Sequence, residues 1–91
     1  MTDHPLAPYA WGQRAHAMGQ LQRGEARWDV YLEMLPDPEG RPVRGRLHFL
    51  AGDRHRQSAW LFVEWSEREL RERFNEFSPI ELWSLLESLG P

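Results

Sequence analysis

The sequence predicts an α+β fold, with a three- or four-stranded antiparallel meander followed by two C-terminal helices packed on one face. Two observations lead to this prediction. Apolar and polar side chains alternate between turn sequences in the middle of the chain, as they do in half-buried strands. Two helix-start motifs then follow one another near the C-terminus. Successive strands followed by successive helices are typical of α+β domains.

Length and composition favour one small domain. The chain has 91 residues, of which 41% are hydrophobic and 27% charged, as is usual for a soluble globular domain. Residues 1–8, MTDHPLAP, contain two prolines and no periodicity, so we expect a flexible N-terminal tail. Residues 9–91 are expected to form the single α+β domain.

Charge and residue usage argue against several classes of function. The net charge of −3 opposes general attraction to nucleic acid or to an anionic membrane. The absence of cysteine excludes disulfides, cysteine-ligated zinc and thiol catalysis, and fits a cytoplasmic protein. The longest apolar run, residues 59–63, is far too short to span a membrane, and the N-terminus lacks a signal-peptide pattern. All the basic residues are arginine, which favours a GC-rich bacterial genome.

Three segments have the pattern of strands. Residues 28–35, WDVYLEML, alternate between two faces, and the turn sequence PDPEGR follows at residues 36–41. Residues 43–50, VRGRLHFL, form the predicted second strand, and Pro42 directly before them suits a strand start because proline cannot donate a ladder hydrogen bond. After a turn at Gly52-Asp53, residues 58–65, SAWLFVEW, form the third. Short loops between successive strands predict an antiparallel meander.

Residues 9–22, YAWGQRAHAMGQLQ, are compatible with either a strand or a helix. Two glycines in this segment count against a helix. A strand would place two sets of side chains on opposite faces: Ala15, Ala17, Gly19 and Leu21 on one, and His16, Met18, Gln20 and Gln22 on the other. The strand would form a hairpin with residues 28–35 through the sequence RGEA. The sheet therefore has three or four strands, depending on this segment.

The stripe of Arg44, Arg46 and His48 on the second strand raises the question of a basic binding face. In the simplest register, Leu35 lies opposite Pro42. The predicted pairs on the outer face are then Glu33 with Arg44, Tyr31 with Arg46, and Asp29 with His48. Since each basic side chain has a neutralising or stacking partner, the stripe is expected to be an internally paired sheet face.

The third predicted strand is apolar on both faces. In one register Trp60 and Phe62 lie outside, and a slip of one residue would expose Leu61, Val63 and Trp65 instead. A strand of this kind is usually covered on both faces. Three covers are open: the N-terminal segment, a second copy of the chain, or another ligand or partner.

The two helices are predicted from their N-caps. Ser66 and Glu69 form one capping box, in which Glu69 is expected to reach the Ser66 amide, and Ser78 and Glu81 form another, with Pro79 at the first helical position. Apolar pairs flank each cap, namely Trp65 with Leu70 and Phe77 with Leu82. Such motifs fix the boundaries of helices and carry no chemistry of their own.

The sequence contains no catalytic or metal-binding pattern that we can identify. The histidines are not spaced as metal ligands, and no HExxH, P-loop or GxSxG motif occurs. Ser66 and Ser78 are assigned to helix caps. We therefore expect no enzymatic activity, no cofactor and no metal.

Charge is distributed unevenly along the chain. Residues 41–57 contain five arginines and one aspartate, whereas residues 67–91 contain six acidic residues and three arginines. The sequence DRHR at residues 53–56 is therefore expected to form a basic hairpin tip. A polarised molecule of this kind suits self-association as well as the binding of phosphates.

These features predict a small non-enzymatic protein-interaction domain that contacts another protein or forms a homodimer. Arginine and aromatic residues are enriched at interface hot spots. The predicted contact residues are Tyr31, Arg46, His48, Trp60 and Phe62, with Arg54 and Arg56 at the rim. The alternative is a module for single-stranded nucleic acid that stacks bases on the same aromatic face and contacts phosphates through Arg44, Arg46 and the basic hairpin tip. No membrane contact is expected.

Overall fold

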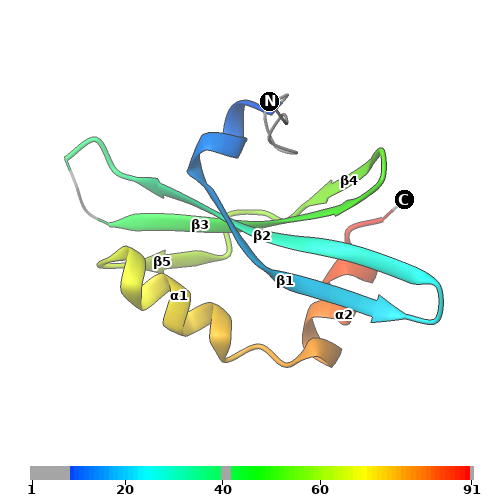
Figure 1. The fold of residues 1–91 in the computed structure, drawn as a ribbon. Helices are drawn as coiled ribbons and strands as arrows, with labels where there is room; N and C mark the ends of the chain where they lie inside the picture. Colours follow the sequence, from blue (N-terminus) through cyan, green and yellow to red (C-terminus); the bar gives the residue numbers. More distant parts are fainter. Residues whose placement is uncertain (1–8, 40–41, 91) are drawn as a thin grey trace.

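The structure is a computed structural model that describes residues 9–39 and 42–90. The predicted tail over residues 1–8 lies outside the described residues. The elements, in chain order, are the 3₁₀ helix η1 (Ala10–Arg14), the strands β1 (Ala15–Arg23), β2 (Ala26–Pro36), β3 (Val43–Ala51), β4 (Arg54–Gln57) and β5 (Phe62–Glu64), and the helices α1 (Glu67–Asn75) and α2 (Pro79–Ser88) (Figure 1).

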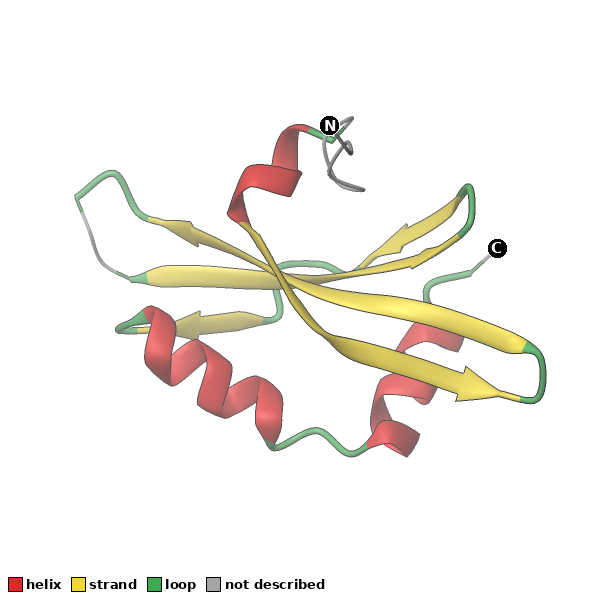
Figure 2. Cartoon of the chain, viewed as in Figure 1, coloured by secondary structure: helices red, strands yellow, loops and turns green. Residues whose placement is uncertain are grey.

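The described strands form one antiparallel sheet. Strands β1 to β4 are neighbours in chain order, and β5 pairs with β3 in addition. Helices α1 and α2 lie on one side of this sheet, which we call the inner face, and η1 lies on the other, the outer face (Figure 2). The predicted fold class, an antiparallel meander followed by two helices on one face, is confirmed.

The segment over residues 9–22 forms a 3₁₀ turn and then the fourth strand of the meander. The predicted hairpin to β2 is present, with its turn at Gly24. A β-bulge between Ala17 and Gly19 interrupts the pairing, and Met18 is the extra residue. Ala17 and Gly19 therefore lie on opposite faces, so the prediction that they share a face is wrong.

The register of β2 against β3 differs by two residues from the predicted one. Leu35 faces Arg44, not Pro42, because Pro36 itself pairs with Val43 and shortens the loop. A shift of two residues keeps every side chain on its predicted face but changes its partner. On the outer face, the observed pairs are Glu33 with Arg46, Tyr31 with His48, and Leu35 with Arg44.

The third predicted strand, residues 58–65, is shortened to β5, and an additional strand, β4, precedes it. Residues 54–57, predicted as a turn, form β4 against the end of β3, and residues 62–64 form β5 against its beginning. The interruption lies at residues 58–61, where the Ser58 hydroxyl accepts a hydrogen bond from the Leu47 amide and donates one to the Ala59 carbonyl. The Ser58 hydroxyl thus takes the place of a backbone carbonyl as the acceptor for the Leu47 amide. The chain bulges over residues 58–61 and pairs with β3 again at Phe62.

The main core lies between the inner face and the two helices. It is built from the inward-facing residues of the strands and the apolar stripes of α1 and α2; its fully buried members include Leu32, Leu47, Phe49, Leu70 and Leu86. Gly45 on β3 allows α1 to approach closely, because a Cβ there would lie 2.7 Å from Leu70 Cδ2. Leu70 is buried against the sheet for this reason.

The two helix caps differ in detail. At α2 the capping box is complete: the Glu81 amide donates to the Ser78 hydroxyl, and the Ser78 amide donates to the Glu81 carboxylate. At α1 the Glu69 amide donates to the Ser66 hydroxyl, but the Glu69 carboxylate accepts from the Trp65 amide, and the predicted bond to the Ser66 amide is replaced. The starts of both helices agree with the predicted ones.

Candidate functional site

The outer face of the sheet brings together four of the seven predicted contact residues. Tyr31 on β2 lies beside Arg46 and His48 on β3. Trp60 joins them from the bulge after β4, and the Arg46 guanidinium lies 4.2 Å from the centre of its ring. An arginine that stacks on an aromatic ring gains a cation–π contact and keeps its hydrogen-bond donors available at the edge.

The other three predicted contact residues lie on the inner face. Phe62 is 3% exposed and packs edge-on against Phe77, so the structure has the register that exposes Val63 and its neighbours instead. The guanidinium groups of Arg54 and Arg56 lie 4.6 and 5.1 Å from the ring centre of Trp28, which belongs to the main core. The basic tip is therefore folded over the edge of the core.

A buried carboxylate organises the outer face. The Glu33 side chain has no exposed surface. Its Oε1 accepts from Arg46 Nε at 2.7 Å and from His48 Nε2 at 2.8 Å, and its Oε2 accepts from Arg14 Nε at 3.2 Å and Nη2 at 2.9 Å. A buried charge needs partners of this kind, because leaving it unpaired would cost several kcal/mol. Glu33 thus ties together η1, β2 and β3.

The chain of hydrogen bonds continues from Glu33 through two histidines. His48 has no exposed surface, and its Nδ1 lies 2.9 Å from Nε2 of His55 on β4. Because an ionised carboxylate only accepts, His48 carries its proton on Nε2, and its Nδ1 is then an acceptor. His55 must therefore donate from its own Nε2. The arrangement fixes the tautomer of both neutral rings.

Trp11 of η1 covers this polar chain. Its ring stacks on His48 with centroids 3.6 Å apart and an angle of 8° between the planes, and it is 7% exposed. Together with Leu50 it forms a second apolar cluster, separate from the main core, against which Tyr9 and Tyr31 pack. The N-terminal segment is one of the three covers that the sequence left open, and Trp11 belongs to this segment.

The burial of these groups shifts their pKa values. Burial alone would raise the pKa of Glu33, but hydrogen bonds from Arg46, His48 and Arg14 outweigh it and hold the pKa below its usual value. Burial lowers the pKa of His48 to about 4, even though Glu33 opposes the shift. Burial and the nearby Arg46 charge also lower the pKa of His55. Both histidines are therefore neutral at pH 7.

A second part of the outer face is exposed and apolar. We call it the β5 patch and define it by four side chains: Leu35, Leu61, Val63 and Trp65, which are 36, 46, 56 and 66% exposed. Arg44 on β3 faces Leu35 on β2 and Val63 on β5. Leu35, Arg44 and Val63 therefore form one row across the sheet. Large exposed apolar side chains gathered in this way are uncommon on a monomer and mark contact sites.

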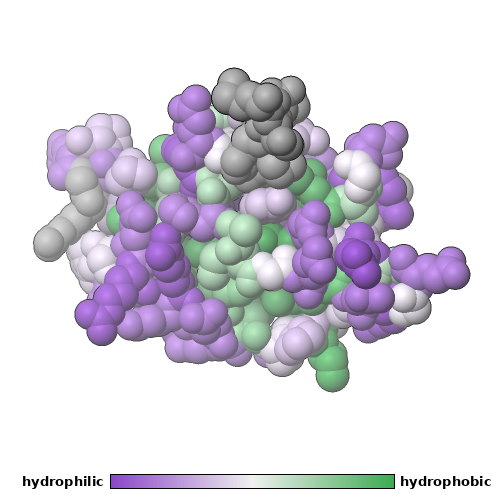
Figure 3. Space-filling model, in the orientation of Figure 1, coloured by the Kyte–Doolittle hydropathy of each residue, from purple (hydrophilic) through white to green (hydrophobic). Residues whose placement is uncertain are grey.

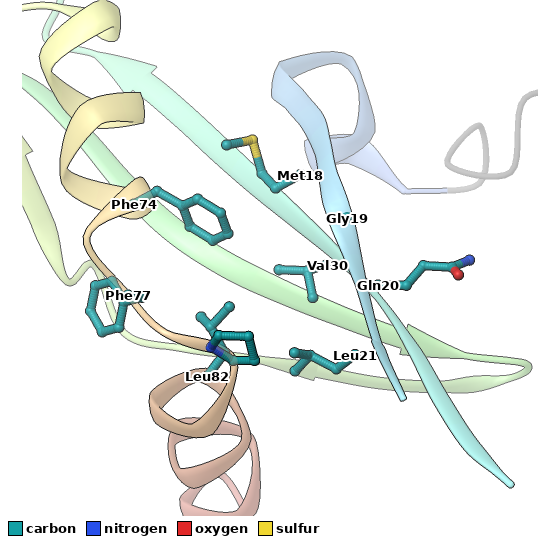
Figure 4. Close-up of a pocket in the computed structure, with 9 residues that line it drawn as sticks. Met18, Gly19, Gln20, Leu21, Val30, Phe74, Phe77 and Leu82 are labelled. Atoms are coloured by element: carbon teal, nitrogen blue, oxygen red, sulfur yellow. The ribbon is translucent and has the colours of Figure 1, made fainter. Parts of the chain in front are cut away.

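One small cavity opens on the opposite side of the molecule, between β1 and the junction of α1 and α2. It has a volume of about 110 Å³ and is lined mainly by apolar side chains, among them Met18, Leu21, Phe74 and Leu82 (Figure 4). The side chain of Gln20 points away from these groups (Figure 4). In the space-filling view, hydrophobic side chains gather in the middle of this face, with hydrophilic ones around them (Figure 3). The cavity offers no titratable or nucleophilic group for catalysis.

The described residues hold no cluster of metal ligands, and three of their serine hydroxyls are used in structural contacts. Among residues 9–39 and 42–90, no group of three or more potential ligands is placed to hold a metal ion. The Ser58, Ser66 and Ser78 hydroxyls are engaged in the bulge and the helix caps. What the outer face offers is a rigid, internally paired polar network beside an exposed apolar patch.

Comparisons of the chain with protein-family models, with curated proteins and with solved structures found no match. No helix in the described part of the chain is long and apolar enough to cross a membrane.

Proposed function

We propose that the protein is a small non-enzymatic interaction domain that forms a homodimer through the β5 patch. The observation that carries this proposal is the exposure of Val63 on β5 and of Leu61 and Trp65 directly before and after the strand, at 56, 46 and 66%. In the described part of the chain, β5 pairs with β3 on one side and with no strand on its other side. An apolar strand with an open edge is a template for pairing with another chain.

The spacing of the exposed residues suits a second copy of the same strand. If two β5 strands pair in an antiparallel manner about a two-fold axis at Val63, each Val63 faces its counterpart, and each Leu61 faces the Trp65 of the other copy. Val63 lies on the outer face, and Leu61 and Trp65 share that face if the chain stays extended for one residue beyond each end of β5. Every large exposed group on the strand thereby gains an apolar cross-strand partner, as an isologous interface requires.

The charges around the patch are compatible with this pairing. Arg44 is exposed next to Val63, so the two copies of Arg44 would be separated by three strand spacings, or about 14 Å. This distance exceeds the Debye length of about 8 Å at physiological ionic strength, so their repulsion is weak. Arg46, stacked on Trp60, lies two residues further along β3 and contributes to the rim.

The alternative, binding of single-stranded nucleic acid, has less support. The arginines that would contact phosphates are divided between the two faces, because Arg54 and Arg56 lie over Trp28 on the inner face. Arg46 is engaged with Glu33 and Trp60. We expect no binding of labelled single-stranded oligonucleotides even at low salt; binding that weakens steeply with salt would support the alternative.

Sedimentation equilibrium tests the proposed dimer. The wild type should be a dimer at about 100 μM, since an interface of this kind is expected to bind at least in the micromolar range. Val63→Lys should be monomeric, because it places a charge at the two-fold axis. Ile80→Lys is the matched control: Ile80 is 74% exposed at the start of α2, away from the patch, and this variant should remain dimeric. A monomeric wild type at about 1 mM, or equal dimerisation of both variants, would contradict the proposal.

A further inference from the structure

The contact between His48 and His55 tolerates only a limited number of protons. When both rings are neutral, His55 Nε2 donates to His48 Nδ1 across 2.9 Å. One added proton can be taken up at Nδ1 of His55, because the ring then still donates from Nε2 to His48 Nδ1. With a second added proton, both facing nitrogens carry hydrogen, and two cations are held at hydrogen-bond distance with no acceptor between them.

The surroundings of the pair cannot neutralise the second proton. From η1 the facing charge is Arg14, and from β3 it is Arg46, both positive. From β2 the facing groups are Glu33, which already accepts four hydrogen bonds, and Tyr31, whose pKa is raised by burial and by the nearby charge of Asp29. Glu33 attracts a charged His48 but is already shared with Arg14 and Arg46, so further stabilisation of the second charge must come from water.

Water can reach His48 only if its cover moves. His48 has no exposed surface, and Trp11 lies flat against it at 3.6 Å. Trp11 and Leu50 form a cluster of their own, whereas the sheet is held to α1 and α2 by the main core on the inner face. Removing Trp11 from the outer face thus leaves the main core intact.

We propose that η1 is an acid-released latch: when the His48–His55 pair takes up its second proton, residues 10–14 detach from the outer face while the sheet and both helices stay folded. Arg14 leaves Glu33 in the same step, because it belongs to η1. The latch is independent of the proposed dimer, since its parts lie on η1, β3 and β4 and not on β5.

Nuclear magnetic resonance of the tryptophan indole N–H groups tests the latch. As the pH of the wild-type protein is lowered from 7 to 3, the Trp11 resonance should move to the position of a solvated indole while the Trp28 resonance, from the main core, stays unchanged. The midpoint of this movement should coincide with uptake of the second proton, followed by the imidazole nitrogen resonances of His48 and His55. A Trp11→Phe variant assigns the signal.

Two substitutions give the test its specificity. His55→Gln keeps a donor for His48 Nδ1 but cannot take up a proton, so the release midpoint should fall by about one pH unit or more. His16→Gln removes a histidine that contacts Arg71 away from the pair, so the midpoint should not change. Simultaneous loss of the Trp11 and Trp28 signals, or an unchanged midpoint in His55→Gln, would overturn the proposal. If His55→Gln does not fold, release in the wild type without uptake of a second proton would overturn it equally.

Discussion

Removal of the buried carboxylate of Glu33 should be among the most damaging single changes in this protein. Glu33→Ala leaves the buried Nε2–H of His48 without an acceptor, which costs about 1–3 kcal/mol. It also removes the hydrogen bond from Arg46, whose side chain is only 21% exposed, at about 1.5–3 kcal/mol. Arg14 is 42% exposed and can turn to water, so it adds little. The expected loss of unfolding free energy is therefore about 3–5 kcal/mol.

Glu33→Gln separates the shape of this side chain from its charge. The amide oxygen of glutamine can take the place of Oε1 and accept from both Arg46 and His48. The amide nitrogen then faces the donors of Arg14, which must move to solvent. We expect this variant to lose about 1–2 kcal/mol, clearly less than Glu33→Ala.

Urea unfolding at pH 7, followed by circular dichroism, measures both losses. Glu72→Ala is the control, since Glu72 forms an exposed pair with Arg68 and its removal should change stability by less than about 0.5 kcal/mol. If Glu33→Ala cost no more than Glu72→Ala, the network would not hold the outer face together, and the reasoning about Glu33 would be refuted.

Three further predictions follow from the same structure. The pKa of His48 is about 4 in the folded protein and about 6.5 in the unfolded chain, so the unfolded chain binds more protons between these pH values. The unfolding free energy should therefore be highest above pH 6.5 and lower by at most ~3 kcal/mol at pH 4. Urea unfolding across this pH range measures the decrease, which His48→Gln should make smaller. The depressed pKa of Glu33 acts in the same direction at lower pH. Gly45→Ala should cost about 1–3 kcal/mol by thermal or urea unfolding, because its Cβ would lie 2.7 Å from Leu70 Cδ2, and the cost should vanish in a Leu70→Ala background. Ser78→Ala should lose about 1 kcal/mol in the same assay through the missing cap of α2; no loss would mean that the capping box is unimportant.

Much of the fold is encoded in local patterns that a single sequence displays. The alternation along β2 and β3 predicted both strands and the faces of their side chains, and the caps at Ser66 and Ser78 predicted both helix starts. The register was off by two residues because Pro36, assigned to the turn, can pair as the last residue of β2. The face on which a side chain lies depends only on whether its position in the strand is odd or even. The residue opposite it depends on the length of the loop, which the composition of the loop does not determine.

The bulge at residues 58–61 could not be predicted from propensity. The apolar run there is typical of a strand, but the hydroxyl of Ser58 contacts the Leu47 amide and breaks the ladder. After this interruption, Phe62 pairs opposite Gly45 and is buried, whereas Val63 and Trp65 are exposed. A long-range contact of this kind leaves no local signal.

The polar network around Glu33 could not be predicted in full from the pattern of each strand taken separately. Pairing across strands suggested that the basic stripe was neutralised, and the structure supports that interpretation for Arg46 and His48. The predicted pairing did not show that Glu33 also accepts hydrogen bonds from Arg14, which lies in the segment before β1. The bulge in β1 and the 3₁₀ turn bring Arg14 and Trp11 over the outer face, and neither feature has a clear pattern in the sequence.

The central claim is that the β5 patch receives the same strand from a second copy. A mixed sample of isotope-labelled and unlabelled protein would report contacts between copies through isotope-filtered nuclear Overhauser effects. The account predicts contacts between the Leu61 methyl groups of one copy and the Trp65 indole of the other, together with contacts between the two Val63 side chains. A sample shown to be dimeric that lacks these contacts, or that has contacts through the face of α2 instead, would contradict it.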